Sequence, residues 1–181
     1  VWSFKIEPVQ VEGGGYDFYL PSSSVLSVET RFFQSTPEKT LTIPSTAARV
    51  ITVGAYDTYT EAYADFSGRG RNMPPSSVNI KPDFVAPGVN IKTLSPGNVP
   101  VAVSGTSFAT PFASGSAALL MEWGIVRGND PFLYGEKVKA YLRRGARPLR
   151  GERNLPNARV GYGKLCVAES IPGKGQPEGT L

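Results

Sequence analysis

The chain of 181 residues lacks histidine altogether and has one cysteine, Cys166. Histidine is the side chain that most often moves protons at neutral pH and binds metals, so neither a histidine base nor a histidine ligand comes from this chain. One cysteine excludes an internal disulfide, and the two counts together argue against a zinc site. We therefore expect no metal ion or other cofactor.

Long apolar runs are missing as well. No stretch reaches the ~18 continuous apolar residues that a membrane-spanning helix needs, so no membrane partner is expected. The first residues, VWSFKIEPVQVEGGG, have neither the basic start nor the apolar core of a signal peptide. The chain begins inside a strand-like pattern, which indicates a fragment of a longer protein.

Charged residues are few, at 19%, and their balance is uneven. The net charge is +4, and residues 121–181 hold 11 Lys or Arg against 6 Asp or Glu. Such a basic segment could attract an acidic partner or nucleic acid, but no recognised nucleic-acid module with interleaved aromatic residues accompanies it. A solvated helix face followed by a basic tail is the simpler interpretation, and no nucleic-acid partner is expected.

Residues 1–43 have the pattern of β-strands. Trp2, Phe4 and Ile6 alternate with polar residues, and a triple glycine then marks a turn. Further strand-like stretches cover residues 16–21, 25–33 and 40–44. We expect this segment to be an antiparallel β piece beside a separate unit formed by residues 44–171.

Residues 44–171 have a mixed pattern. The stretch 48–57 contains a short β-branched run, typical of a strand buried on both faces, and another strand is predicted near residues 89–93. A turn and a short strand are predicted over 160–167, and the Pro- and Gly-rich tail 172–181 is expected to be flexible. Buried strands mixed with helices predict the α/β class with a parallel sheet.

An amphipathic helix is predicted over residues 131–144. Its periodicity divides the side chains into an apolar face and a basic face. The face expected to point inward holds Phe132, Val138, Tyr141 and Leu142, and the outward face holds Lys137, Lys139, Arg143 and Arg144.

The stretch VSGTSFATPFASGSAALLMEWGI, residues 103–125, predicts a second helix that starts at or beside Ser107 and has little polar face. The N–H of a serine there lies in the first turn, where the helix dipole favours a developing oxyanion. Gly105 permits close approach of backbone or substrate, and Pro111 is expected near the end of the first turn. A buried helix with a capped start explains the same stretch without any catalytic role.

The motif itself favours the first interpretation. Gly-Thr-Ser-Phe-Ala-Thr-Pro resembles the nucleophile motif Gly-Thr-Ser-x-Ala-x-Pro of the subtilisin-like serine proteases. Further segments resemble this family in the family's own order: IPSTAARVITVGAYD, KPDFVAPGVNIKTL, GEKVKAYLRRGARPL and GYGKLCVAESI. Together they extend over residues 44–171. Residues 1–43 are similar to the end of a β-rich, jelly-roll-like insertion in clostridial spore-germination proteases of this family.

The resemblance implies the C-terminal part of a subtilisin-like parallel-sheet fold, preceded by antiparallel strands of an insertion domain. It also implies an endopeptidase that acts on proteins or peptides. Ser107 would be the nucleophile, with its backbone N–H directed at the oxyanion. Thr106 would support the oxyanion site, and Gly105 would lie at the substrate.

No complete triad is visible beside this serine. The catalytic Asp and His and the oxyanion Asn of the family belong to motifs that this chain lacks, so the chain alone is expected to be inactive. Lys81 or Lys92 could in principle replace the histidine, although no motif supports that role. Asp57, Asp65 and Asp83 are interpreted as structural or loop acids.

Two other functions stay open. A pseudoprotease would use the same fold for binding or signalling, and a β-rich interaction module would need only residues 1–43 to fold and bind. Expected partners are an N-terminal half of the catalytic domain that carries Asp and His, or a second copy that covers the open sheet edge. The resemblance implies secretion or association with the spore or cell envelope.

Overall fold

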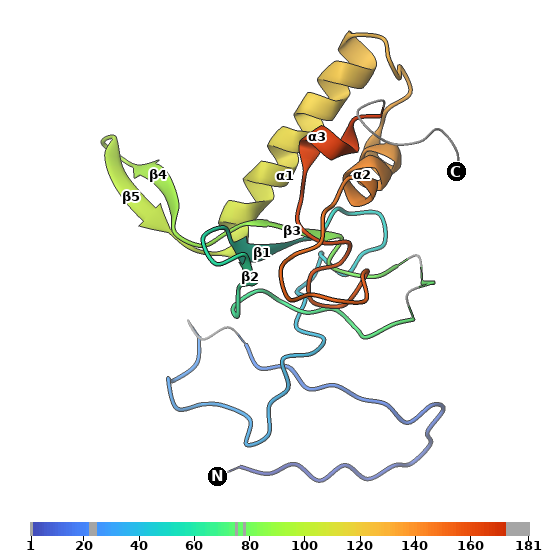
Figure 1. Ribbon diagram of the computed structural model, residues 1–181. Helices are drawn as coiled ribbons and strands as arrows, with labels where there is room; N and C mark the ends of the chain where they lie inside the picture. The colour runs from blue at the N-terminus through green and yellow to red at the C-terminus, as the bar shows by residue number, and fades with distance from the viewer. Residues whose placement is uncertain (1, 22–24, 75, 78, 173–181) are drawn as a thin grey trace. The chain divides into compact units, whose positions relative to one another are not determined.

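The computed structural model describes residues 2–21, 25–74, 76–77 and 79–172, and Figure 1 traces the chain. The tail predicted to be flexible lies outside the described residues, apart from Pro172. Packing divides the chain into two compact units, Val1–Thr36 and Pro37–Leu181. The predicted domain boundary after residue 43 falls inside the second unit.

The first unit differs from the antiparallel strands predicted for it, because none of its described residues lies in a strand or helix. Its backbone hydrogen bonds are local, such as the 2.6 Å bond from Gly15 N–H to the Gly13 carbonyl. The rings of Phe4 and Phe18 stack with 6.1 Å between their centroids. A period-two pattern decides which side chains share a face, but a strand also needs a hydrogen-bonded neighbour.

The second unit contains a three-stranded sheet in the order β2–β1–β3. β1 (Val53–Asp57) is parallel to β3 (Phe84–Pro87) and antiparallel to the short β2 (Ala62–Tyr63). β1 occupies the second half of the strand predicted over residues 48–57. The parallel pair agrees with the predicted α/β class.

A separate antiparallel hairpin joins this sheet to the first helix. It consists of β4 (Ile91–Ser95) and β5 (Val99–Val103), and Figure 1 shows it projecting away from the sheet. The strand predicted near residues 89–93 is therefore β4, displaced by two residues. Only Ser104 and Gly105 separate the end of its partner β5 from the start of the first helix.

The helices follow the hairpin. α1 (Thr106–Met121) contacts β1 and β3 and continues as a π-helical turn over Glu122–Val126. α2 (Gly135–Arg144) and the short α3 (Val167–Ser170) contact each other and α1, as Figure 1 shows. Within the part of the chain that the structure describes, no helix combines the length and apolarity needed to cross a membrane.

α1 was predicted to have little polar face, and it buries only one stripe of its surface. Ala109, Ala113, Ser116 and Leu120 recur with helical spacing and are buried. Leu120 and Ala113 join the largest core cluster, whose other buried members are Phe84, Leu133, Val138 and Leu142. The opposite side of α1 is exposed and carries mostly small residues: Ser107, Pro111, Ser114, Gly115 and Ala118.

α2 also departs from its predicted faces. Val138 and Leu142 are buried as predicted, whereas Phe132 lies before the helix and is exposed. Lys139 and Arg143 were assigned to the solvent face, yet both point into the protein. Helical periodicity distinguishes apolar from polar positions, but it does not reveal a buried acid that pairs with basic side chains.

Candidate active site

Ser107 is the second residue of α1, and it is exposed. Because the helix begins at Thr106, the Ser107 N–H lies in the first turn, where the helix itself supplies no acceptor for it. No acidic residue stands in that turn, so the positive end of the helix dipole is not neutralised by a neighbouring helical acid. The position therefore combines a hydroxyl with a backbone donor suited to an anion.

Gly105 precedes α1 and fixes how the helix starts. Its φ of 153° and ψ of 157° lie in a region that residues with a side chain rarely adopt. Its N–H donates to the Gly88 carbonyl at 2.8 Å, and its own carbonyl accepts the Phe108 N–H at 3.1 Å. This geometry makes glycine necessary here for backbone reasons.

Gly88 is a positioning residue that the sequence interpretation missed. Besides accepting from Gly105, it donates its N–H to the Tyr56 carbonyl at 3.0 Å. A Cβ at Gly88 would lie 2.6 Å from the Ala55 Cβ, so only glycine lets the chain after β3 pass this close to β1. The signal was present in the Ala-Pro-Gly of the segment KPDFVAPGVNIKTL.

Pro111 lies deeper in α1 than predicted. It is the sixth residue of the helix rather than the end of the first turn. A residue here would normally donate its N–H to the carbonyl four residues earlier, that of Ser107, and proline has no N–H. The backbone next to Ser107 is therefore released from one helical hydrogen bond.

A cavity of about 580 Å³ opens beside the start of α1, within the second unit. Thr106, Ser107 and Thr110 form its helical wall, while Gly105 is not among its described lining residues. The rest of the lining comes from three parts of the chain: Pro37, Thr40, Leu41, Thr42 and Ser45; Ile51, Thr52, Val53 and Gly54; and Asp65, Phe66, Ser67 and Gly68.

One wall of this cavity is held in place by a backbone strap, which forms where a strand over residues 40–44 was predicted. Thr40 donates its N–H to the Arg69 carbonyl at 2.8 Å, and Arg69 returns its N–H to the Thr40 hydroxyl at 2.9 Å. The Arg69 guanidinium also pairs with Glu38 at 3.1 Å. The expected strand does not form, and these bonds fix the segment against the loop after β2 instead.

The two lysines considered as substitute bases are not brought to this cavity. Lys81 is buried, and its Nζ donates to the Val50 carbonyl at 2.6 Å and the Thr52 hydroxyl at 3.0 Å. Lys92 is exposed on β4. Neither is among the described lining residues. The described residues also contain no group of three or more His, Cys, Asp or Glu side chains that could hold a metal ion.

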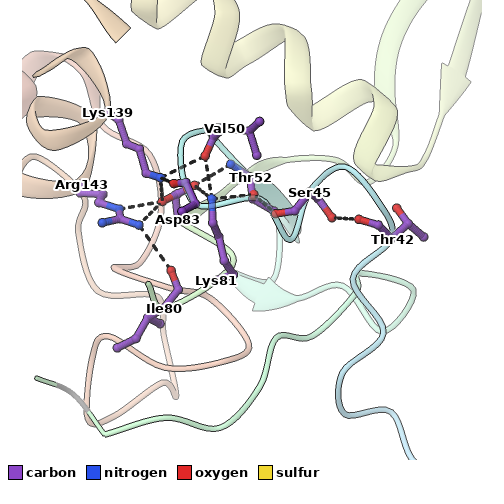
Figure 2. Close-up of polar contacts among 10 residues, drawn as sticks. Thr42, Ser45, Val50, Thr52, Ile80, Lys81, Asp83, Lys139 and Arg143 are labelled. Carbon is purple, nitrogen blue, oxygen red and sulfur yellow. Dashed lines mark hydrogen bonds and ion pairs between the residues drawn. The ribbon is translucent and has the colours of Figure 1, made fainter. Parts of the chain in front are cut away.

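A buried ion cluster around Asp83 connects Thr52 of the cavity lining to Lys81 and α2 (Figure 2). Asp83 is fully buried, accepts the Thr52 N–H at 2.6 Å and pairs with Lys81 at 3.0 Å. From α2, Arg143 donates its Nε–H to Asp83 at 2.7 Å, and Lys139 lies 3.4 Å away. Burial lowers the pKa of Lys139 to about 8, although the charge of Asp83 opposes the shift. Asp83 is thus a structural acid, as predicted.

Comparisons with known proteins agree with this fold. The subtilase family model, Peptidase_S8, matches residues 27–163, and the chain belongs to this family of serine proteases. The match begins inside the segment that was predicted to be an insertion.

Three of the relatives are proteases of which this chain covers less than half. Serine protease AprX of Bacillus subtilis is 35% identical over 156 residues, which cover 75% of this chain and 33% of AprX. The solved CspB protease of Clostridium perfringens is 47% identical with a TM-score of 0.71, covering 78% of this chain and 29% of that chain. The solved patellamide maturation protease PatA is 33% identical with a TM-score of 0.60, covering 74% of this chain and 46% of that chain.

Proposed function

We propose that Ser107 is the nucleophile of a serine endopeptidase whose base lies outside this chain. The main support for this proposal is the position of Ser107. This serine is exposed at the second position of α1 and lines a cavity, and it directly follows Thr106 and the constrained Gly105. The sequence contains no histidine, so a histidine base must come from another segment or another chain. This chain by itself is then inactive.

The reaction is an acyl transfer in two halves. The Ser107 hydroxyl oxygen attacks the peptide carbonyl carbon while the base takes its proton, and the resulting oxyanion accepts the Ser107 N–H. The C–N bond breaks when the base returns the proton to the leaving amine, and an ester to Ser107 remains. Water then attacks this ester, which releases the acid and restores the hydroxyl.

A fluorophosphonate probe tests the assignment, because it labels a serine only where a base activates the hydroxyl. The full-length protein should be labelled at Ser107, and Ser107→Ala should abolish the label. Ser114→Ala is the matched control, since Ser114 is exposed on α1 outside the described cavity lining and should leave the label unchanged. Equal labelling of Ser107→Ala and the parent would overturn the proposal.

A pseudoprotease is the second candidate, and the absence of histidine is the observation that favours it. Such a protein would keep the fold and the cavity but would not activate Ser107. An unlabelled, folded full-length protein that still binds peptides in the cavity would establish this alternative.

We also propose that a partner surface covers exposed apolar side chains of α1, such as Phe112 and Leu119. The preferred partner is the remainder of a subtilase catalytic domain, and a second copy of this chain is the alternative. Sedimentation velocity separates the two, because a second copy makes the mass of the isolated chain depend on its concentration.

A further inference from the structure

The cavity beside Ser107 has a single ionisable side chain among its described lining residues, and that side chain is Asp65. The other lining residues are apolar, hydroxyl-bearing or glycine. A carboxylate in a wall that otherwise carries no charge makes that wall locally attractive to a cation.

The backbone holds Asp65 firmly at this wall. Asp65 and Phe66 are the two central residues of a turn closed by the 2.8 Å bond from Ser67 N–H to the Ala64 carbonyl. The turn is attached to β1 at both ends: Ala64 N–H donates to the Ala55 carbonyl at 3.1 Å, and Ala55 N–H donates to the Ser67 hydroxyl at 3.0 Å. The position of Asp65 therefore follows from the sheet and does not depend on a loose loop.

The Asp65 carboxylate is available to a ligand. Within the described part of the chain it forms no hydrogen bond or ion pair, and the residue is exposed. The other two acids grouped with it from the sequence are engaged: Asp57 accepts the Tyr59 N–H at 2.8 Å, and Asp83 is surrounded by cations. Asp65 is thus the acid of this group that faces the cavity without a protein partner.

The same wall also offers apolar surface. Phe66 lines the cavity next to Asp65 and is 52% exposed, and Leu41 belongs to the lining segment that is hydrogen-bonded to the same loop. Lysine and arginine place their aliphatic stems on apolar surface while the charged end stays at a polar group, and both cations also bind the faces of aromatic rings.

We propose that Asp65 is a specificity-determining residue that receives a lysine or arginine side chain of the peptide substrate. This inference rests on the proposed role of Ser107, because it takes the cavity beside Ser107 to be the place where the peptide binds. The charged end of the substrate side chain pairs with the Asp65 carboxylate, and its stem lies along Phe66.

The test uses the full-length protein and peptides that carry Lys, Met or Glu at one position near the scissile bond. The parent should cleave the Lys peptide with a kcat/KM about fivefold above that of the Met peptide, as a partly solvated charge pair provides. Asp65→Asn should reduce this ratio to about one, and Asp65→Lys should make Glu the preferred side chain. A ratio that stays unchanged in Asp65→Asn, or a parent that does not prefer Lys, overturns the proposal.

A control and a second measurement separate this proposal from the assignment of Ser107. Asp57→Asn removes a carboxylate outside the described cavity lining and should keep the preference of the parent. Calorimetric binding of the same peptides to the Ser107→Ala protein reports the preference without any chemistry. If binding prefers Lys in a way that depends on Asp65 but Ser107 is not labelled by the fluorophosphonate, the role of Ser107 is rejected and that of Asp65 is kept. If Ser107 is labelled but binding shows no such preference, the role of Asp65 is rejected and that of Ser107 is kept.

Discussion

At the scale of single residues, the start of α1 depends on two glycines that touch each other. Gly105 bonds to Gly88, and Gly88 bonds in turn to Tyr56 at the end of β1. The position of the Ser107 backbone and the direction of its N–H therefore follow from backbone contacts with the sheet. Side chains contribute little here, because the cap of α1 makes no side-chain hydrogen bond.

Replacing Gly105 by alanine tests this dependence. Gly105→Ala should lower the free energy of unfolding by about 1–3 kcal/mol, because alanine must either hold strained torsions or shift the helix start. The shift should also slow fluorophosphonate labelling of Ser107, and urea denaturation with labelling on the same preparation measures both effects. Gly135→Ala is the control, since a Cβ there meets no atom within 4 Å. Parent-like behaviour of Gly105→Ala would contradict the constraint.

At the scale of elements, the Asp83 cluster joins the segment before β1, the segment before β3, and α2. One carboxylate faces Lys81, Lys139 and Arg143, so its removal leaves buried positive charges without compensation. Asp83→Asn should lower the free energy of unfolding by about 3–5 kcal/mol. The matched control Glu122→Gln breaks an exposed pair with Arg127 and should change it by about 1 kcal/mol or less. Equal losses in denaturant titrations would show that the cluster does not brace these elements.

Because Lys139 of α2 belongs to this cluster, its contribution to the free energy of unfolding depends on pH. The pKa of Lys139 is about 8 in the folded protein and 10.5 without the shift, so between these values the unfolded chain binds more protons than the folded one. The contribution of Lys139 to the free energy of unfolding therefore increases as the pH rises through this window. Urea titrations at pH 7 and pH 10 should show the parent gaining stability relative to Lys139→Met. A difference that stays constant or shrinks would place the pKa of Lys139 near its ordinary value.

The elements that the sequence predicts correctly are those defined by local pattern. β1, α1 and α2 follow from a β-branched run, a small-residue stretch and an amphipathic repeat, because burial leaves a periodic trace in neighbouring residues. The inward direction of Arg143 could not be predicted in this way, since its partner Asp83 lies 60 residues earlier. The strands expected in residues 1–43 fail for a related reason, because alternation carries no information about a pairing neighbour.

At the scale of the whole molecule, the second unit leaves large apolar side chains exposed along α1 and the turn after it. Five large apolar side chains on this stretch are exposed: Phe112, Leu119, Met121, Ile125 and Val126. Exposed large apolar side chains are the observation that supports the proposed partner surface. The chain spans only 33% of AprX and 29% of the CspB chain, so the relatives contain much additional sequence that could supply a cover.

A charge placed on this stretch distinguishes a covered surface from an exposed one. Leu119 is 56% exposed, so Leu119→Asp should change the free energy of unfolding of the 181-residue chain by about 0.5 kcal/mol or less. In the full-length protein the same change should lower it by about 2–3 kcal/mol, because an unpaired carboxylate would then be buried against the partner surface. Tyr59→Asp, at a residue that is 95% exposed on the turn after β1, should have little effect in both forms. Similar small effects of Leu119→Asp in the two forms would mean that no further sequence packs against α1, and the partner would have to be sought on another surface.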